Sequence, residues 1–421
     1  MTSPALPETP LPHSGLVDLL TSPDARAALD QLVGSTTADP VTAATQLRKR
    51  FVPDIVAAVL TLHELRSRAA VTRKFSHAKA MLLTRAGYEQ ASSEGIARWR
   101  ARRFAGSSAI ADLCCGIGGD LMALAELPSL ARLTAVDLDA DHLAMALANA
   151  RLIAPNGPIA AMHADVRDID LTDMDGVFID PARRDAGGRF AHGETEPPLD
   201  WCLELAGRIP RVGIKLAPGI DHNRVPPGWE LETIAIDTDL KEAVLWSPAL
   251  ATAARRATVI RDGEAFSMTG AGDEADALPP LTTPEAGQWL HDPNPAVTRA
   301  GLVQSLGAAI DARQVDHQIA FLISDTPVRT PFARSRQIIA SQPWDERELR
   351  KTLAALNAGA IDIRRRGLAG DVDTIAKRLR KTLPKAGGRA LWIAMTRTDD
   401  RPWAIVCAET PDTSADGIPA R

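Results

Sequence analysis

Apolar runs alternate with glycine turns and helical patterns through the middle of the chain, and this alternation predicts an α/β fold. The apolar run at 109–113 predicts a buried strand, the glycines at 116–119 a tight turn, and the apolar positions at 121–127 the start of a helix. A second apolar run ends at Asp137, at about the distance expected for the next parallel strand of a βαβ unit. Such a unit is built to hold a nucleoside, because glycine admits a ligand close to the backbone and a helix start offers free N–H groups.

The pattern changes before this core. Periodic apolar positions at 52–65 and 78–83 predict helices, so that residues 1–105 are expected to form a helical N-terminal region.

The α/β core is expected at 106–270. Its last two strands are predicted to form an antiparallel pair joined by a charged turn at 237–242. A stretch rich in glycine, aspartate and proline at 270–284 predicts a linker, followed by a mixed α/β domain at 280–410 and a flexible tail at 411–421. The strands expected after the first are 133–137, 176–180, 212–216, 231–236 and 243–246.

Composition bounds the class of protein. A chain of 421 residues with 45% hydrophobic residues is expected to fold into two or three domains with real cores. The four cysteines have no metal-ligand spacing, and the adjacent pair Cys114 and Cys115 does not suit a disulfide framework. With no signal peptide and no long apolar run, a soluble cytoplasmic protein without a bound metal is expected.

The net charge of −5 argues against a nucleic-acid partner, but the distribution of charge argues for one. Basic residues gather at 48–103 and again at 364–389. Segregated basic faces suit a phosphate backbone, whereas the blander interpretation is a solvated helix surface. The two runs favour a nucleic acid as the partner.

The glycine spacing bears on which nucleoside is bound. Leu121 stands where a dinucleotide fold has its third glycine, and no P-loop sequence replaces it. Asp112 followed by Gly116, Gly118 and Gly119 resembles the first motif of class I S-adenosylmethionine-dependent methyltransferases. The resemblance implies that these residues lie under the methionine part of S-adenosyl-L-methionine. It also implies that Asp137 holds the ribose; the alternative is an ordinary βαβ turn without a cofactor.

Two further positions fit that donor. Asp165 follows a short strand, where its carboxylate is able to accept a hydrogen bond from the adenine amine, with the Val166 backbone N–H as a second contact. A plain turn residue is the alternative interpretation of Asp165.

The segment after the fourth strand carries the acceptor chemistry. Asp180 and Pro181 stand where open α/β sheets place reactive groups. Arg183, Arg184 and Arg189 follow around two glycines, as expected of a loop that grips a phosphate, although a surface loop with salt bridges has the same composition. Lys215 ends the next strand, where it either reaches the substrate or neutralises Asp180.

The motif D-x-x-C-G-x-G-G, which includes Cys115, resembles the trimethylguanosine synthase branch of RNA methyltransferases. Residues 85–97 are similar to the segment that closes over the donor in those enzymes. A closer resemblance is to bacterial class I methyltransferases with a C-terminal THUMP-like domain, carried by YEQAS at 88–92, DPARR at 180–184 and GIKLAPGID at 213–221. It extends through DLKE at 239–242 and covers about residues 50–410. It implies a Rossmann-like methyltransferase sheet, S-adenosyl-L-methionine as cofactor and an RNA-binding-like appendage.

One departure limits the acceptor. Cap-base and N6-adenine enzymes have an aromatic residue after strand 4, whereas this chain has Ala182 and Arg183 after Asp180-Pro181. Base stacking therefore has few candidates, among them Phe190, Trp201 and Tyr88.

These observations predict a methyltransferase that acts on RNA, at a base N or a ribose or base O. Asp180 is expected to orient or deprotonate the nucleophile, Pro181 to shape the pocket, and Arg183 and Arg184 to anchor the strand. The alternatives are a methyltransferase for a small molecule or a protein, and a non-catalytic RNA-binding protein with a relic core.

Overall fold

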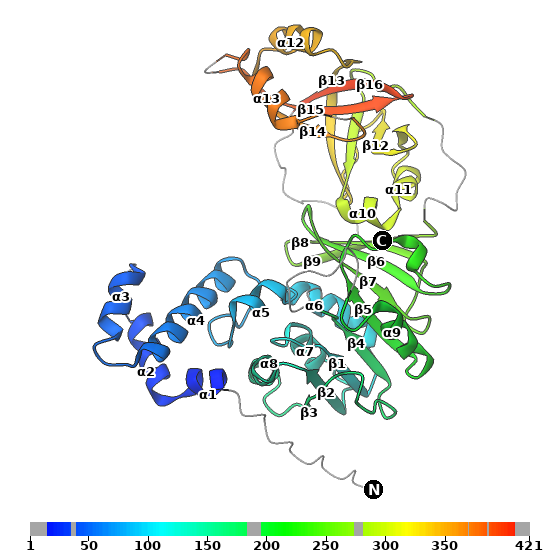
Figure 1. The fold of residues 1–421 in the computed structure, drawn as a ribbon. Coiled ribbons are helices and arrows are strands. Elements are labelled where there is room, and N and C mark those ends of the chain that lie inside the picture. Colours follow the sequence, from blue (N-terminus) through cyan, green and yellow to red (C-terminus); the bar gives the residue numbers. More distant parts are fainter. Residues whose placement is uncertain are drawn as a thin grey trace. The chain divides into compact units, whose positions relative to one another are not determined.

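The computed structural model describes residues 15–34, 39–182, 195–272, 281–368, 370–384 and 387–408. The chain divides into two compact units (Figure 1). The first unit comprises Met1–Glu230 and Ala243–Thr252, and the second comprises Leu231–Glu242 and Ala253–Arg421. The domain limits predicted at 105, 270 and 280 stay predictions.

The N-terminal part of the first unit is helical, as its periodicity predicts. Three of its helices begin with a proline at the first turn, where the missing N–H is not needed, and Ser22 and Asp39 cap two of them through their side-chain oxygens. Ala28, Leu47 and Val59 are among the apolar residues buried in the core that these helices share. The helices are α1 Gly15–Thr21, α2 Pro23–Val33, α3 Pro40–Leu47, α4 Pro53–Val71, α5 Arg85–Gln90 and α6 Glu94–Ala101, followed by the 3₁₀ turn η1 Arg102–Phe104.

The helix predicted at 78–83 is wrong. This stretch is a turn followed by an extended segment, and its apolar side chains are nevertheless buried. The fully buried Asn149 replaces the helical hydrogen bonds there: its Oδ1 accepts from the Leu82 N–H at 2.8 Å and its Nδ2 donates to the Leu82 carbonyl at 3.0 Å. Burial against the core has therefore overridden the local periodicity.

The sheet of the first unit is parallel over five strands, in the order β3-β2-β1-β4-β5, and β7 pairs antiparallel with β5. The order reverses between β1 and β4, which is the switch point where open α/β sheets bind ligands. The elements are β1 Ala109–Leu113, α7 Gly119–Ala125, β2 Arg132–Asp137, α8 Ala140–Ile153, β3 Ile159–His163, β4 Gly176–Ile179, α9 Leu199–Glu204, η2 Leu205–Gly207, β5 Arg211–Leu216 and η3 His222–Arg224. The strand β7 Asp239–Trp246 belongs to the first unit from Ala243 on.

The six predicted strands of the core are confirmed, with one correction to the turn between the last two. The strand β7 already begins at Asp239, so only residues 237 and 238 separate it from β6 Glu230–Ile236. Asp237 adopts a left-handed φ of 51°, which aspartate tolerates in a tight turn. The charged residues at 239–242 belong to the strand because their alternation leaves one face exposed.

The second unit contains β6, β8 Arg255–Arg261 and β9 Glu264–Gly270, of which the last two are not predicted from the sequence. It also contains a seven-stranded sheet in the order β11-β12-β10-β13-β16-β15-β14, in which β14 and β15 are parallel. Helices α10 and α11 pack with β8 in one core, and α12 and α13 pack on β14 and β15 in another. The elements are β10 Trp289–Pro293, α10 Pro295–Ala300, α11 Val303–Ala309, β11 Arg313–Asp316, β12 Ile319–Ser324, β13 Ala333–Pro343, α12 Glu346–Ala355, β14 Ala358–Arg365, α13 Val372–Arg380, β15 Arg389–Thr398 and β16 Arg401–Ala408.

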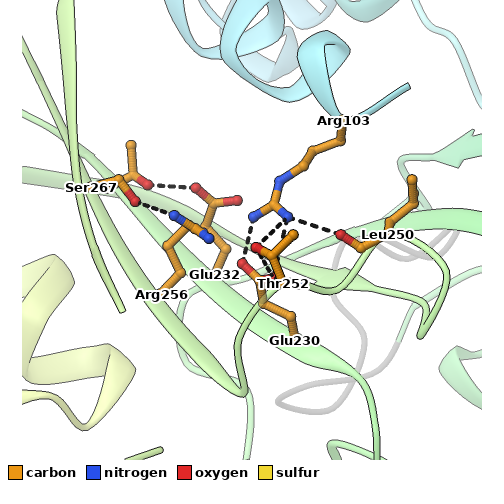
Figure 2. A network of polar contacts seen from close by, with 8 residues as sticks. Arg103, Glu230, Glu232, Leu250, Thr252, Arg256 and Ser267 are labelled. Atoms are coloured by element: carbon orange, nitrogen blue, oxygen red, sulfur yellow. Dashed lines mark hydrogen bonds and ion pairs between the residues drawn. The ribbon is translucent and has the colours of Figure 1, made fainter. Parts of the chain in front are cut away.

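Figure 2 shows two polar clusters, one around Glu230 in the first unit and one in the second unit, where Arg256 donates to Ser267 Oγ at 2.6 Å. In the first unit, the guanidinium of Arg103 donates to Glu230 Oε1 at 2.5 Å and to the Leu250 carbonyl at 2.9 Å, and the Thr252 N–H donates to Glu230 Oε2 at 2.7 Å. Glu230 is fully buried, so its charge is matched by Arg103. The cluster joins η1, which precedes β1, to two later segments of the first unit.

Candidate functional site

A cleft of about 800 Å³ opens at the carboxyl ends of β1, β2 and β4, at the switch point of the sheet. The helix α5 and the residues after it line one side of this cleft, as the predicted closing segment at 85–97 requires. The lining residues come from 85–92, 112–120, 137–142, 165–167, 180–182 and 196–197.

The predicted glycine turn forms part of the cleft wall. Gly118 has φ +85°, and a Cβ there would lie 2.8 Å from the Ala146 Cα, so helix α8 packs directly against this glycine. Gly116 has φ +54° and a Cβ there would meet open space, whereas a Cβ at Gly119 would approach the Ser92 carbonyl to 3.3 Å. The loop thus leaves room in front of Gly116 for a ligand to approach the backbone.

Asp137 pins this turn from the end of β2. Its Oδ2 accepts from the Gly116 N–H at 2.8 Å, and its Oδ1 accepts from the Asp139 N–H at 2.8 Å. Burial raises the pKa of Asp137 above its usual range, in spite of these two hydrogen bonds. The carboxylate lines the cleft with its orientation fixed, and its contact with a ribose stays a prediction.

Asp112 is the most unusual group of the cleft. It lies on β1, is fully buried, and neither of its carboxylate oxygens has a hydrogen-bond partner among the described residues. Burial, with repulsion from Asp120 and Asp180, raises the pKa of Asp112 well above its usual range. A buried carboxyl group without a partner is costly, so this position suits a ligand that brings a positive charge or hydrogen-bond donors.

Sequence reasoning missed the buried ion pair beside it. Arg100 of α6 donates to Asp120 Oδ1 at 2.5 Å, and its guanidinium lies 4.9 Å from the centre of the Phe178 ring. Arg100 is 1% exposed, although its sequence neighbours suggest a basic surface. The aspartate in the first turn of α7, directly after the glycines, is the signal that was available.

Asp165 is engaged by its own neighbour. The Arg167 side chain donates to Asp165 Oδ1 at 2.9 Å and to Oδ2 at 2.6 Å, and a third nitrogen lies 2.7 Å from Glu196 Oε1. The hydrogen bonds from Arg167 hold the pKa of Asp165 below its usual range. Asp165 and Val166 both line the cleft, and their contacts with adenine stay a prediction.

Asp180 lines the cleft at the end of β4, and it forms an ion pair with the buried Lys215. The Lys215 ammonium donates to Asp180 Oδ2 at 2.5 Å, and Lys215 is 5% exposed. Lys215 is not among the residues that line the cleft, so the structure favours neutralisation of Asp180 over direct contact with a substrate.

Pro181 and Ala182 continue the wall after Asp180. Ala182 and Glu196 form an antiparallel bridge, with N–H to carbonyl distances of 2.8 and 2.9 Å. The bridge holds both described ends of the arginine-rich segment at the cleft. The predicted phosphate ligands Arg183, Arg184 and Arg189, together with Phe190, lie outside the described residues.

Of the other two stacking candidates, Tyr88 is buried, and stacking on the half-buried Trp201 stays a prediction. Tyr88 is 5% exposed, its hydroxyl lies 3.2 Å from Thr72 Oγ1, and the Lys74 ammonium lies 4.6 Å from its ring centre. Neither Tyr88 nor Trp201 lines the cleft. The ring of Tyr88 instead joins α5 to the end of α4.

The two basic runs are less free than the sequence suggests. In the first, Arg98 pairs with Glu94 and Glu126, and Arg100 and Arg103 pair inside the first unit. In the second, Arg366 pairs with Asp292 and Arg378 with Glu346. Part of each run is therefore used within its own unit.

No group of three or more His, Cys, Asp or Glu side chains is placed to hold a metal ion in the described part of the chain. None of the described helices has the length and apolar character that crossing a membrane requires.

A parallel sheet closed by an antiparallel β7, a glycine turn after β1 and an acid at the end of β2 define a class I methyltransferase fold. An uncharacterised S-adenosylmethionine-dependent methyltransferase of Mycobacterium tuberculosis, from strains CDC 1551 and H37Rv, is 38% identical over 323 residues, which is 75% of this chain and 84% of that relative. The chain belongs to this family of S-adenosylmethionine-dependent methyltransferases.

Further comparisons agree with this fold. The crystal structure of a candidate methyltransferase from Porphyromonas gingivalis W83 matches with a TM-score of 0.69 and 17% identity, over 94% of this chain and 99% of that one. The family described as THUMP domain-like matches residues 333–409, the span from β13 to β16. A domain of unknown function (DUF8688) matches residues 16–69, the span of the first four helices. The predicted fold class, enzyme class and C-terminal THUMP-like domain are confirmed.

The cleft fits S-adenosyl-L-methionine, the predicted cofactor of this family. This donor carries a sulfonium and an ammonium group, and the orphaned carboxyl of Asp112 is suited to compensate a cation. The open space in front of Gly116 admits the ligand to the backbone, and Asp137 presents a fixed carboxylate. These three residues, with the rest of the 112–120 loop, are the ones that would hold the donor.

Proposed function

We propose that this methyltransferase acts on structured RNA and that the acceptor atom, a base N or a ribose or base O, enters the cleft beside Asp180. Two observations support the proposal. The cleft places Asp180 and Pro181 next to the donor residues, and the second unit carries the THUMP-like match. The single observation that carries it is the ion pair of Asp180 with Lys215, because it leaves one fixed acid on the acceptor side.

Bound S-adenosyl-L-methionine supplies an activated methyl group, so the protein has mainly to align the nucleophile and exclude water. In this proposal, Asp180 accepts the hydrogen bond of the nucleophile's N–H or O–H and takes its proton at the oxygen that Lys215 does not hold. Lys215 is a positioning residue, since its contact fixes Asp180 Oδ2 from inside the protein. Pro181 shapes the wall, and Arg183 with Arg184 anchors a strand phosphate beside it.

The THUMP-like domain is assigned the docking of the RNA. Such a role needs no catalytic group in the second unit, and it predicts that removal of residues 285–421 weakens RNA binding and leaves donor binding intact. The arginines at 183, 184 and 189 are proposed to make the local phosphate contacts, because the Ala182–Glu196 bridge fixes their segment's ends at the cleft.

The test is to incubate the purified protein with tritiated S-adenosyl-L-methionine and separate fractions of cellular RNA, protein and metabolites. Label in RNA is expected, and an Asp180→Asn variant is expected to lose it while it still binds the donor in calorimetry. Label confined to the protein or metabolite fraction would refute the RNA acceptor.

A second candidate, a small-molecule or protein acceptor, is favoured by one observation. Among the described residues that line the cleft, seven carry carboxyl groups and two carry guanidinium groups, a balance that suits a neutral or cationic acceptor better than a polyanion. This candidate predicts no salt-dependent affinity for RNA, whereas an RNA enzyme binds more weakly as salt rises. The carboxyl groups are Glu89, Asp112, Asp120, Asp137, Asp165, Asp180 and Glu196, and the guanidinium groups are Arg85 and Arg167.

A further inference from the structure

We propose that the second unit holds an anion site that takes a phosphate group. A cavity of about 80 Å³ is lined by Arg261 at the end of β8, Arg334 on β13 and Arg364 on β14. A guanidinium presents planar, paired N–H donors that match the oxygens of phosphate. Three of them around one small cavity, brought from three strands, form a cage for a tetrahedral anion. Thr238, Asp292 and Asn294 also line it.

The charge balance of this cavity is positive. Asp292 is the acid among the described residues that line it, and Arg366 from behind already donates to Asp292 Oδ1 at 2.8 and 3.1 Å. Arg364 approaches Asp292 Oδ2 only to 3.4 Å through its Nε. The ion pair of Arg364 with Asp292 is therefore longer than that of Arg366.

The other two arginines are also weakly committed. Arg261 Nε lies 3.9 Å from Asp237 Oδ1, which is the limit of an ion pair. Arg334 is exposed and has no ion pair within the part of the chain that the structure describes. Mutual repulsion of three guanidinium groups is reduced when an anion lies between them, so binding a phosphate stabilises this arrangement.

The size of the cavity selects the kind of ligand. The cavity is small, about 80 Å³, and this size suits a single phosphate group better than a nucleobase. Part of the wall is fixed before a ligand binds, because Arg366 holds Asp292 at 2.8 Å.

A phosphate group reaches the site from one of two sources, an RNA strand or the free ion. We assign it to an RNA strand, and this assignment rests on the proposed function. Binding of the phosphate group itself does not depend on it, since the three arginines recognise the same oxygens in either source.

The test uses the full chain and two probes. The variants are Arg334→Ala and Arg364→Ala, with Arg334→Lys to keep the charge but remove the paired donors. Arg401→Ala is the matched control, because Arg401 is an exposed arginine of the same unit outside the cavity. The unfolding temperature is measured in inorganic phosphate and in chloride at equal ionic strength. Short RNA with a 5′-phosphate or a 5′-hydroxyl is followed by fluorescence anisotropy.

Inorganic phosphate is expected to raise the unfolding temperature of the wild type and of Arg401→Ala and to have no effect on the two alanine variants. RNA affinity is expected to fall about tenfold in each alanine variant, with Arg334→Lys in between, because each loses a charge-assisted contact. A loss in 5′-phosphorylated RNA alone identifies a terminal phosphate, and an equal loss in both RNAs identifies a phosphate within the strand.

Two outcomes overturn the inference in distinguishable ways. If phosphate stabilises neither the wild type nor the control, and the alanine variants bind RNA like Arg401→Ala, there is no phosphate site. If phosphate protection is lost in the variants but RNA affinity is unchanged, the ligand is the free ion and the RNA source is wrong. Failure of methyl transfer to RNA with intact phosphate binding would instead count against the proposed function alone.

Discussion

The Lys215 ammonium lies 2.5 Å from the Asp180 carboxylate, and the lysine is buried while the aspartate faces the cleft. The pair joins the end of β5 to the end of β4, on the side of the switch point opposite the donor loop. Lys215 fixes one oxygen of Asp180, so the other oxygen is left to accept a hydrogen bond in the cleft. The proposed acceptor chemistry depends on this relationship.

Replacing Lys215 by Met is expected to lower the methyl-transfer rate by about 10²-fold with little change in donor affinity, because Asp180 loses its orientation and charge partner. Lys215→Arg is expected to restore part of the rate. The rate is measured with tritiated donor and donor affinity by calorimetry. Lys241→Met, which removes an exposed lysine of β7 that lies outside the cleft, serves as the control. Equal rates for the wild type and Lys215→Met would remove the positioning role.

Asp112→Asn is expected to stabilise the ligand-free protein and to weaken donor binding. The pKa of Asp112 is raised in the folded state by burial, so above about pH 4 the unfolded carboxyl releases a proton that the folded one retains. Stability therefore falls as pH rises, by about 1.4 kcal/mol per pH unit until the folded carboxyl ionises. The advantage of the variant over the wild type grows over the same range, as thermal unfolding at several pH values will show. A constant difference would contradict this account.

Gly118→Ala and Gly116→Ala form a matched pair, since both glycines have positive φ. A left-handed alanine costs about 1–2 kcal/mol, and only the Cβ at 118 also clashes, 2.8 Å from the Ala146 Cα. We expect Gly118→Ala to lower stability clearly more than Gly116→Ala, while Gly116→Ala lowers donor affinity more than stability. Denaturant unfolding and calorimetry measure the two effects. Equal losses of stability would contradict the packing of α8 on Gly118.

His291 is expected to make the stability of the second unit fall in acid. It is fully buried on β10, with its ring nitrogens 2.7 Å from Ser335 Oγ and 2.7 Å from Ser324 Oγ. Burial lowers the pKa of His291 to about 4, so as pH falls below about 6.5 the unfolded state takes a proton that the folded state refuses. The contribution lost between pH 6.5 and 4 is up to about 3 kcal/mol. Thermal unfolding against pH, with the exposed His317→Asn as control and His291→Gln as the test variant, measures it.

The sequence predicts most of the first unit, because its strands are continuous apolar runs and its glycine turn has fixed chemistry. It failed at 78–83, where Asn149 supplies the hydrogen bonds that a helix would have made, and a contact 67 residues away leaves no local signal. It also missed β8 and β9, whose polar and apolar residues do not form a clear run. Among the site residues, Asp112, Asp137 and Asp180 were predicted to lie in one pocket and they do. The pairing of Arg100 with Asp120 was not foreseen, since charge counting treats every arginine as exposed.

The Arg103–Glu230 contact spans 127 positions of the chain, and Glu230 has no exposed surface. The contact ties η1, before β1, to a residue that follows the parallel strands of the same compact unit. A shortened chain that started at residue 106 would strand a buried carboxylate and remove one wall of the cleft in the same cut. The donor pocket therefore needs the helices before β1 as well as the sheet.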